Sequence, residues 1–422
     1  MGKKQPRKTN NNKRSDDAKK PSSKNPNRSI TRRAKSNAIP PLPEDLILEI
    51  LSRLPVKSLF RFRSACKRCL TIIDSPSLVD LHLSQSQTRP CGPLILVSFS
   101  GPDSKHYFYS ASLEGGPAVR LLQLPGGCSS YVSESLNGLV CFYNGRDVYV
   151  INPSTRKSRS LQASHSNCEY SSYSFGFDPS NNDYKVLHII TRKLYDMQYE
   201  VLTIKGGSKK HKEVFTSHGN NISWRKITHV PPCSYIFKGQ GVCVDGAIYW
   251  ICVKVPSEEV LVVVFDVGSE KFRSLPLPEG ISPSIYLSYP EGISPSVYLS
   301  YKLNKIGGRL ALLKDRDCDC ITIEIWVLED CHNKWVQNTI VSPQKYEILF
   351  TFLSNSSPVT VYKGETLHFS KTEPYQYISW DHWDHKNKAS RPIRISEALN
   401  IRSVESIRVS ITNYVYCVIC LS

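Results

Sequence analysis

The 422-residue sequence contains no uncharged apolar run long enough to span a bilayer. Its first residues are polar and basic, so they lack the apolar core of a secretory signal peptide. We therefore expect no membrane association and a soluble intracellular chain, located in the nucleus and/or the cytoplasm. In a reducing compartment the fourteen cysteines are expected to be free thiols rather than a disulfide framework.

The sequence also lacks the short motifs that identify common catalytic sites. No GxxxxGK[ST], GxSxG or HExxH pattern occurs. The two Cys-x-x-Cys pairs are not followed by a His pair at zinc-finger spacing, so we interpret their cysteines as core or loop thiols. His382, Asp384 and His385 are interpreted as a turn between strands. The sequence therefore predicts no metal site, no cofactor and no enzymatic activity.

The first 38 residues have few apolar side chains. Thirteen of them are Lys or Arg and two are Asp, a net charge of +11 out of the +17 of the whole chain. Such a segment buries too little apolar surface to offset its chain entropy, so residues 1–38 are predicted to be a disordered basic tail. Basic clusters of this kind can direct nuclear import or contact nucleic-acid phosphates. No aromatic residues alternate with these charges, which disfavours nucleic acid as a partner. The remaining charge of +6 predicts no large basic surface elsewhere.

Residues 39–88 show the apolar spacing of short helices. A proline followed by two acidic residues suits the start of the first helix. Leu46, Ile50 and Leu54 recur every four residues, which predicts an apolar stripe, and Pro55 then ends that helix. A second stripe runs through Leu59, Phe62, Cys66, Cys69 and Ile73. Helices this short expose too much apolar surface to be stable alone, so they are expected to pack on the rest of the chain or on a partner protein.

The string LPEDLILEILSRLPVKSLFRFRSACK, with the following I-x-SP-x-LV-x-LHL, resembles the F-box of plant F-box proteins. The resemblance covers residues 40–83 and implies docking to the SKP-type adaptor of an SCF (SKP–cullin–F-box) ubiquitin ligase. The adaptor-facing positions that it implies are Leu42, Pro43, Leu46, Ile50, Leu54, Pro55 and Leu59. The family usually has Trp where this chain has Cys69, which removes apolar area at that position.

From Cys91 onward the sequence changes to strand-like segments. Runs such as PLILVSF, YKVLHII and EVLVVVFDV are rich in β-branched and aromatic residues and are separated by Gly, Asn, Asp and Pro. Glycine-containing hairpin signals recur in SLNGLVCF, CVDGAIYW and IGGRLALL. Five or six such units predict a β-propeller of four-stranded blades, with a β-sandwich as the alternative. The expected fold class is α+β multidomain, a small helical unit followed by a mostly antiparallel all-β domain.

Two local features of this second part carry further expectations. Trp224, Phe272 and Trp335 each follow a strand and a polar turn, and they are expected at equivalent inner positions of successive β units. Residues 278–289 read PEGISPSIYLSY, and residues 290–301 repeat them with one change. This tandem duplication is too short for a propeller blade, and its Pro and Gly residues predict a long surface loop or an extra hairpin.

The segments SLNGLVCF, VYVINPSTRK, FGFDPSNNDYKVL, VCVDGAIYW and VVFDVGSEKFRSLPLP follow one another as in the plant F-box-associated domain. In proteins of this architecture the second domain holds a target protein for ubiquitin transfer. The resemblance therefore implies a substrate-receptor subunit: residues 39–88 bind the SKP-type adaptor and, through it, cullin, while residues 91–422 bind an unknown target. The alternative is a β-propeller scaffold or a nucleic-acid-associated protein whose helices only cap it. Adaptor copurification and salt-dependent nucleic-acid binding distinguish these two hypotheses.

Overall fold

The computed structural model describes residues 42–87 and, with gaps, residues 94–414. The gaps of five or more residues within the second range are 113–117, 162–169, 206–222, 289–295, 315–321, 342–364 and 395–408. The predicted basic tail, residues 1–38, lies outside the described residues, and so do His385, Cys417 and Cys420.

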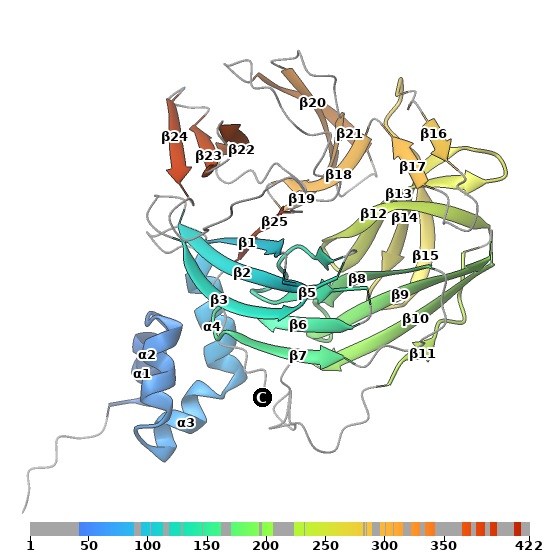
Figure 1. The fold of residues 1–422 in the computed structure, drawn as a ribbon. Helices are drawn as coiled ribbons and strands as arrows, with labels where there is room; N and C mark the ends of the chain where they lie inside the picture. Colours follow the sequence, from blue (N-terminus) through green and yellow to red (C-terminus); the bar gives the residue numbers. More distant parts are fainter. Residues whose placement is uncertain are drawn as a thin grey trace, which may run out of the picture. The chain divides into compact units, whose positions relative to one another are not determined.

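Four helices open the described part of the chain: α1 (Glu44–Ser52), α2 (Val56–Arg63), α3 (Lys67–Ile73) and α4 (Pro76–Gln87) (Figure 1). Both acidic residues of the predicted start lie in the first turn of α1, where they face the positive end of the helix dipole. Pro55 is the N-cap residue of α2, in extended conformation, so the chain turns there as predicted. The second apolar stripe is divided between α2 and α3, because the helix ends at Ser64 and restarts after Cys66.

Helices of this length do not cross a bilayer. None of the helices in the described ranges is long and apolar enough to do so.

The rest of the described chain forms antiparallel sheets that follow one another in chain order (Figure 1). The first sheet contains β1 (Leu94–Ser100), β2 (Lys105–Ser112), β3 (Val119–Pro125) and β25 (Val409–Tyr414). The second contains β4 (Tyr131–Val132), β5 (Val140–Tyr143), β6 (Val148–Asn152) and β7 (Lys157–Leu161). The third contains β8 (Tyr170–Asp178), β9 (Asp183–Lys193), β10 (Asp196–Lys205) and β11 (Arg225–Lys226).

The remaining sheets repeat this meander of neighbouring strands. The fourth contains β12 (Ser234–Val244), β13 (Ala247–Val255), β14 (Val260–Asp266) and β15 (Lys271–Leu275). The fifth contains β18 (Tyr301–Ile306), β19 (Arg309–Lys314), β20 (Thr322–Glu329) and β21 (Lys334–Val341). A three-stranded sheet follows, with β22 (Glu365–Thr372), β23 (Tyr377–Asp384) and β24 (Ala389–Arg394).

Strand β13 shows why these sheets are propeller blades. Its residues Ile248 and Trp250 pack in an apolar core shared with strands β8–β10, while the intervening Tyr249 and Ile251 pack in a second core shared with β18–β20. The fourth sheet is therefore covered on both faces by its neighbours, whereas each sheet of a two-layer sandwich keeps an outward polar face. Burial on both faces also explains the continuous apolar run of this strand. The predicted fold class, helices followed by an antiparallel β-propeller, is confirmed, and the sandwich alternative is not adopted.

The predicted glycine hairpins lie between the first two strands of their blades. In the turn between β12 and β13, Asp245 and Gly246 both have positive φ, 45° and 79°. Asn137 and Gly138 repeat this pair of values, 50° and 82°, before β5. Two successive residues with positive φ define a type I′ turn, which suits Asn-Gly and Asp-Gly because glycine carries no Cβ.

The chain end returns to the first blade. Strand β25 pairs antiparallel with β1, with Ile411 opposite Val97, so residues more than three hundred positions apart share one sheet. This pairing completes a fourth strand for a blade whose other three strands come from the start of the domain. The pairing of β25 with β1 covers an edge of β1 that could otherwise pair with another chain.

The tandem duplication forms the extra hairpin that the sequence allowed. Strand β16 (Ile285–Ser288) comes from the first copy and β17 (Ser296–Leu299) from the second, and they pair antiparallel with Tyr286 opposite Tyr298. The two copies thus pair with each other as strands of a two-stranded sheet, which lies in the sequence between the fourth and fifth blades.

The three aromatic residues expected at inner positions lie elsewhere in their blades. Phe272 is in β15 and Trp335 is in β21, the fourth strand of each sheet, and Trp224 directly precedes β11, also a fourth strand. All three are half-buried. They occupy similar positions, as predicted, but the inner placement was wrong, because all three lie in or next to the fourth strand, at the edge of its sheet.

Candidate functional site

The helical unit has a small apolar core of its own. The core contains six buried side chains, Leu51, Val56, Leu59, Ile72, Ile73 and Leu78. Polar contacts add to it: the imidazole Nε2 of His82 in α4 lies 3.0 Å from the carbonyl oxygen of Leu54, and Ser52 donates a hydrogen bond to the side chain of Gln85. These contacts fix α4 against the end of α1, so the unit holds its outer face in a defined geometry.

That outer face exposes large apolar side chains. Among the described residues, seven large hydrophobic side chains are exposed, and five of them lie between positions 42 and 70. Leu46 and Ile50, 50% and 51% exposed, lie one turn apart on α1, on the face opposite the buried Leu51. Leu42, just before α1, is exposed as well. Neighbouring apolar side chains that stay exposed to solvent in the folded state indicate a contact surface for another molecule.

The structure separates the predicted adaptor-facing residues into three groups. Exposed side chains are found at Leu42, Pro43, Leu46, Ile50 and Pro55. Leu54 is half-buried and packs against the helical core. Leu59 is fully buried, with 0% of its surface exposed, because the second helix turns that side chain toward Leu51 and Leu78. We therefore correct its assignment from a surface position to a core position.

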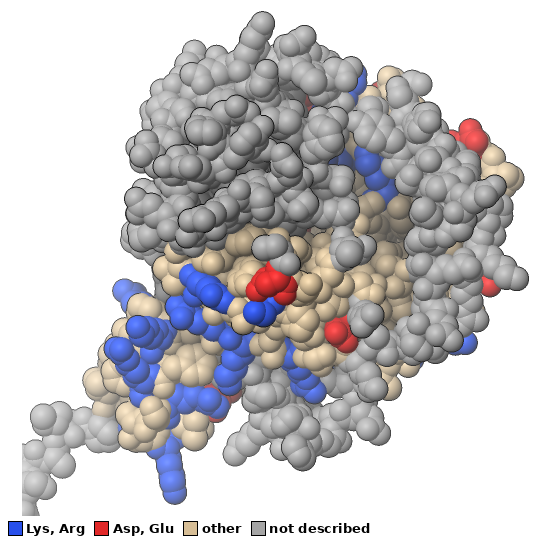
Figure 2. Space-filling model, in the orientation of Figure 1, with Lys and Arg blue, Asp and Glu red and all other residues tan. Residues whose placement is uncertain are grey.

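The helical unit also carries a basic segment, which the sequence analysis did not anticipate. Residues 53–68 hold six Lys or Arg and no Asp or Glu. Figure 2 shows Lys and Arg gathered over the region of the helices. Arg53 pairs with Glu49, and Arg63 pairs with Asp74 at 2.8 Å. Lys57, Arg61 and Lys67 have no ion pair within the part of the chain that the structure describes. The net charge of residues 39–422 is only +6, because acidic residues elsewhere offset the six basic residues of this segment. The net charge alone therefore did not indicate a basic segment here.

Cys66 and Cys69, which the sequence analysis interpreted as core or loop thiols, lie at the start of α3. Cys66 is the N-cap residue of α3 and is exposed, and Cys69 is half-buried one turn later. The backbone N–H of Cys69 donates to Cys66 Sγ at 3.2 Å, and the two sulfur atoms lie 3.1 Å apart. The backbone hydrogen bond from Cys69 and the side-chain contact with Cys69 lower the pKa of Cys66, whereas the contact with Cys66 raises the pKa of Cys69.

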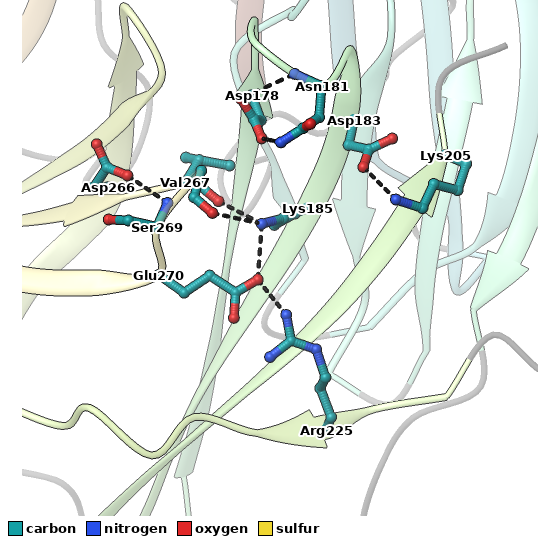
Figure 3. A network of polar contacts seen from close by, with 11 residues as sticks. Asp178, Asn181, Asp183, Lys185, Lys205, Arg225, Asp266, Val267, Ser269 and Glu270 are labelled. Carbon is teal, nitrogen blue, oxygen red and sulfur yellow. Dashed lines mark hydrogen bonds and ion pairs between the residues drawn. The ribbon is translucent and has the colours of Figure 1, made fainter. Parts of the chain in front are cut away.

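In the β domain, a polar network joins the third blade to the fourth (Figure 3). Lys185, on β9, donates to the carbonyl oxygen of Val267 at 2.6 Å and to Glu270 Oε1 at 2.7 Å. Glu270 also pairs with Arg225, next to Lys226 at the blade edge. Asp178 accepts hydrogen bonds from the Ser180 backbone and the Asn181 side chain, which fixes the turn before β9.

This network gives a structural role to two of the sequence segments named above. Asp178 belongs to FGFDPSNNDYKVL, and Asp266, which accepts a hydrogen bond from the Ser269 backbone at 2.6 Å, belongs to VVFDVGSEKFRSLPLP. Both aspartates stabilise hairpin turns at the junction of two blades. In these two segments the aspartates therefore have a role in folding.

Among the described residues, no group of three or more His, Cys, Asp or Glu is arranged to hold a metal ion. The lone GxG of Gly239 and Gly241 lies within β12, and a Cβ on Gly241 would come within 2.6 Å of the Trp250 ring. This glycine allows Trp250 to pack, and it does not open a helix as a phosphate-binding loop would.

Comparisons with known proteins agree with both parts of the chain. Residues 39–81 match the F-box domain family, and residues 95–415 match the F-box associated beta propeller domain family. The Arabidopsis thaliana F-box protein At2g21930 is 28% identical over 334 residues, which cover 74% of each chain. Another Arabidopsis thaliana protein named as an F-box protein, At1g47790, is 31% identical over 355 residues, covering 80% of this chain and 82% of that one.

Among solved structures, the β-propeller domain of the trilobed protease from Pyrococcus furiosus is similar over 75% of this chain and 82% of that chain. Its TM-score is 0.36 and its sequence identity is 8%, values too low to support any conclusion about function.

Proposed function

Because this chain belongs to the plant F-box proteins that carry an F-box-associated β-propeller domain, we propose that it is the substrate receptor of an SCF-type ubiquitin ligase. In this role residues 39–88 bind an SKP-type adaptor and, through it, cullin. The propeller binds a target protein and holds it for ubiquitin transfer. The chain itself performs no catalytic step in this proposal.

The observation that carries the proposal is the exposed apolar row of α1. Leu46 and Ile50 are about half exposed, although the unit has a core that could have buried them. Keeping two such side chains in water costs stability, so a partner surface that covers them is favoured by the hydrophobic effect. Leu42 and Pro55, which the resemblance to the F-box also implies as contact positions, are exposed as well.

The exposed basic side chains of α2 and α3 favour a partner with acidic groups. Lys57, Arg61 and Lys67 are exposed, and no carboxylate pairs with them in the described ranges. Charges at the rim of an interface raise the association rate more than the final affinity, and salt reduces this effect. We therefore expect adaptor association to slow down as the salt concentration rises, with a smaller change in the dissociation rate.

A binding measurement tests the proposal. The full chain is immobilised, and the Kd for a purified SKP-type adaptor is measured for the parent and for the double variant Leu46→Ala, Ile50→Ala. Apolar anchors at the centre of an interface contribute about 2 kcal/mol or more, so the double variant should bind at least about thirtyfold more weakly. The matched control is Val230→Ala, because Val230 is an equally exposed apolar residue outside the helical unit.

The outcomes separate this proposal from the alternative. Weak binding by the double variant with unchanged circular dichroism supports the adaptor-binding surface. No binding by the parent chain would refute the receptor proposal. Strong, salt-sensitive binding of the parent to a DNA or RNA duplex, together with no adaptor binding, would instead favour the nucleic-acid-associated alternative.

We further propose that the chain acts in the nucleus and/or the cytoplasm. Support comes from the basic clusters of residues 1–38, which suit an import receptor that binds an extended segment.

A further inference from the structure

Cys66 and Cys69 form a close thiol pair at the start of α3. Their sulfur atoms lie 3.1 Å apart, and the spacing of two intervening residues places both on one side of the helix start. A disulfide has a sulfur–sulfur distance of about 2.05 Å, so bond formation requires the two atoms to approach by about 1 Å. Rotation of the exposed Cys66 side chain can supply this movement without displacing the helix.

Cys66 is the only exposed cysteine among those that the structure describes, whereas Cys69 and Cys233 are half-buried. Cys141, Cys243 and Cys252 are buried in the β domain. Burial raises the pKa of Cys141 to about 12 and that of Cys243 to about 11, so neither forms a thiolate near neutral pH. Cys66 is accessible to solvent, and Lys67 and Arg68 place positive charge beside it. Reactive cysteines have this combination of access and electropositive surroundings, whereas buried thiols are inert.

The two thiols have different roles in the pair. Cys66 accepts a hydrogen bond from the Cys69 backbone N–H, which stabilises its thiolate form. Cys69 is half-buried and packs against the helical core, so it is protected from direct attack on an external disulfide. Its sulfur can nevertheless reach Cys66. The geometry thus makes Cys66 the attacking thiol and Cys69 the resolving thiol.

We propose that Cys66 and Cys69 are a reversible dithiol–disulfide pair that is oxidised by small disulfides such as glutathione disulfide. In the first step Cys66 thiolate attacks one sulfur of glutathione disulfide, forms a mixed disulfide and releases one glutathione thiolate. In the second step Cys69 loses its proton and attacks Cys66 Sγ, which releases the second glutathione. Two protein thiols are oxidised to one disulfide, and one glutathione disulfide is reduced to two glutathione molecules.

The pair lies within the helical unit, so its oxidation state can affect adaptor binding; this consequence alone rests on the proposed function. The disulfide would hold the start of α3, and α3 contributes Ile72 and Ile73 to the core that supports α1. The redox reaction itself is measured without any adaptor, so failure of one proposal is distinguishable from failure of the other.

Peptide mapping of the full chain tests the pair directly. The reduced protein is incubated with glutathione disulfide at pH 7.5, quenched with acid and alkylated. Trypsin cleaves after Lys67 and after Arg68, between the two cysteines, so the disulfide would link the peptide of residues 64–67 to the peptide beginning at Cys69. Fragmentation of the linked pair assigns the bond to Cys69 rather than to Cys91. Cys141 and Cys252 serve as internal controls and should remain reduced.

Two single variants separate the roles of the thiols. In Cys69→Ser, the mixed disulfide with glutathione should accumulate on Cys66, because no resolving thiol is present. In Cys66→Ser, Cys69 should react at least about tenfold more slowly than Cys66 does in the parent. If Cys66 and Cys69 of the parent both remain reduced after this treatment, or if the linked peptides do not form, the proposal is overturned. The parent result decides this even if a variant does not fold.

Discussion

The Lys185 side-chain nitrogen lies 2.7 Å from Glu270 Oε1 and so joins β9 of the third blade to the turn that precedes β15 of the fourth. Both side chains are largely buried, and Lys185 also donates to the Val267 carbonyl oxygen. Blades of a propeller have few backbone hydrogen bonds between them, so side-chain contacts of this kind fix the angle at which neighbouring sheets pack.

Replacing Lys185 should therefore destabilise the β domain. Lys185→Met removes the charge and leaves the Val267 carbonyl oxygen without this donor, so we expect a loss of about 3 kcal/mol in the free energy of unfolding. Lys205→Met is the matched control: its ion pair with Asp183 has the same 2.7 Å distance, but Lys205 is 73% exposed. An exposed pair contributes less than about 1 kcal/mol. Urea unfolding of both variants measures the difference, and equal losses would contradict the role given to Lys185.

The same contact makes stability depend on pH. Burial raises the pKa of Glu270, but hydrogen bonds from Arg225 and Lys185 outweigh it, and the net pKa lies below the ordinary 4.5. Because the folded pKa is lower than the unfolded pKa, this stabilisation is complete above the unfolded value and is lost as pH falls through the folded value. The parent should therefore lose stability below about pH 5 more steeply than Glu270→Gln does. Thermal unfolding between pH 3 and 7 checks this, and parallel curves would exclude the effect.

Core and surface positions of the helical unit should respond differently to truncation. Leu59→Ala removes a fully buried side chain and should destabilise the helices by about 3 kcal/mol. Ile50→Ala removes a half-exposed side chain and should leave helix stability nearly unchanged while weakening adaptor binding. Hydrogen exchange of residues 42–87 reports the first effect and the adaptor Kd reports the second. If Leu59→Ala binds the adaptor much more weakly while its helices stay fully protected from hydrogen exchange, Leu59 belongs to the contact surface after all.

Two tryptophans of the β domain offer a parallel comparison. Trp250 is buried, and its indole N–H donates to Ser174 Oγ at 3.2 Å. Trp250→Ala should therefore lower the free energy of unfolding by about 3 to 5 kcal/mol. Trp335 is half-buried in the fourth strand of its blade, and its N–H donates to the Pro276 carbonyl oxygen at 3.1 Å. Trp335→Ala should therefore lower the free energy of unfolding by clearly less than Trp250→Ala does. Chemical unfolding of both variants measures this order, and the reverse order would place Trp335 deeper than the structure does.

Deleting residues 1–38 should leave the folded domains intact. The segment carries a net charge of +11 and few apolar side chains, so it contributes little buried surface. We expect a nearly unchanged melting temperature and a shift of a fluorescent fusion from the nucleus toward the cytoplasm. A large fall in the melting temperature would show that these residues support the fold.

Several features of this protein could be predicted from local sequence. Proline and acidic residues set the starts of α1 and α2, and Asn-Gly or Asp-Gly set the hairpin turns, because these preferences depend on the backbone of a few neighbouring residues. The duplicated segment allowed either a surface loop or a hairpin, and the structure shows the hairpin. Strand character followed from the β-branched and aromatic composition of each run.

Only the tertiary structure decided which face of each element is covered. Leu46, Leu51 and Leu59 are chemically alike, yet the first is exposed and the other two are buried, because the packing of α4 and α3 selects one face of each helix. The contact of Lys185 with Glu270 joins residues 85 positions apart, and β25 pairs with β1 across the whole domain. The conformational preferences of neighbouring residues determine where the chain turns. Burial depends on contacts with segments that are distant in the sequence. The tertiary structure was therefore needed to identify the contact surface and the junctions between blades.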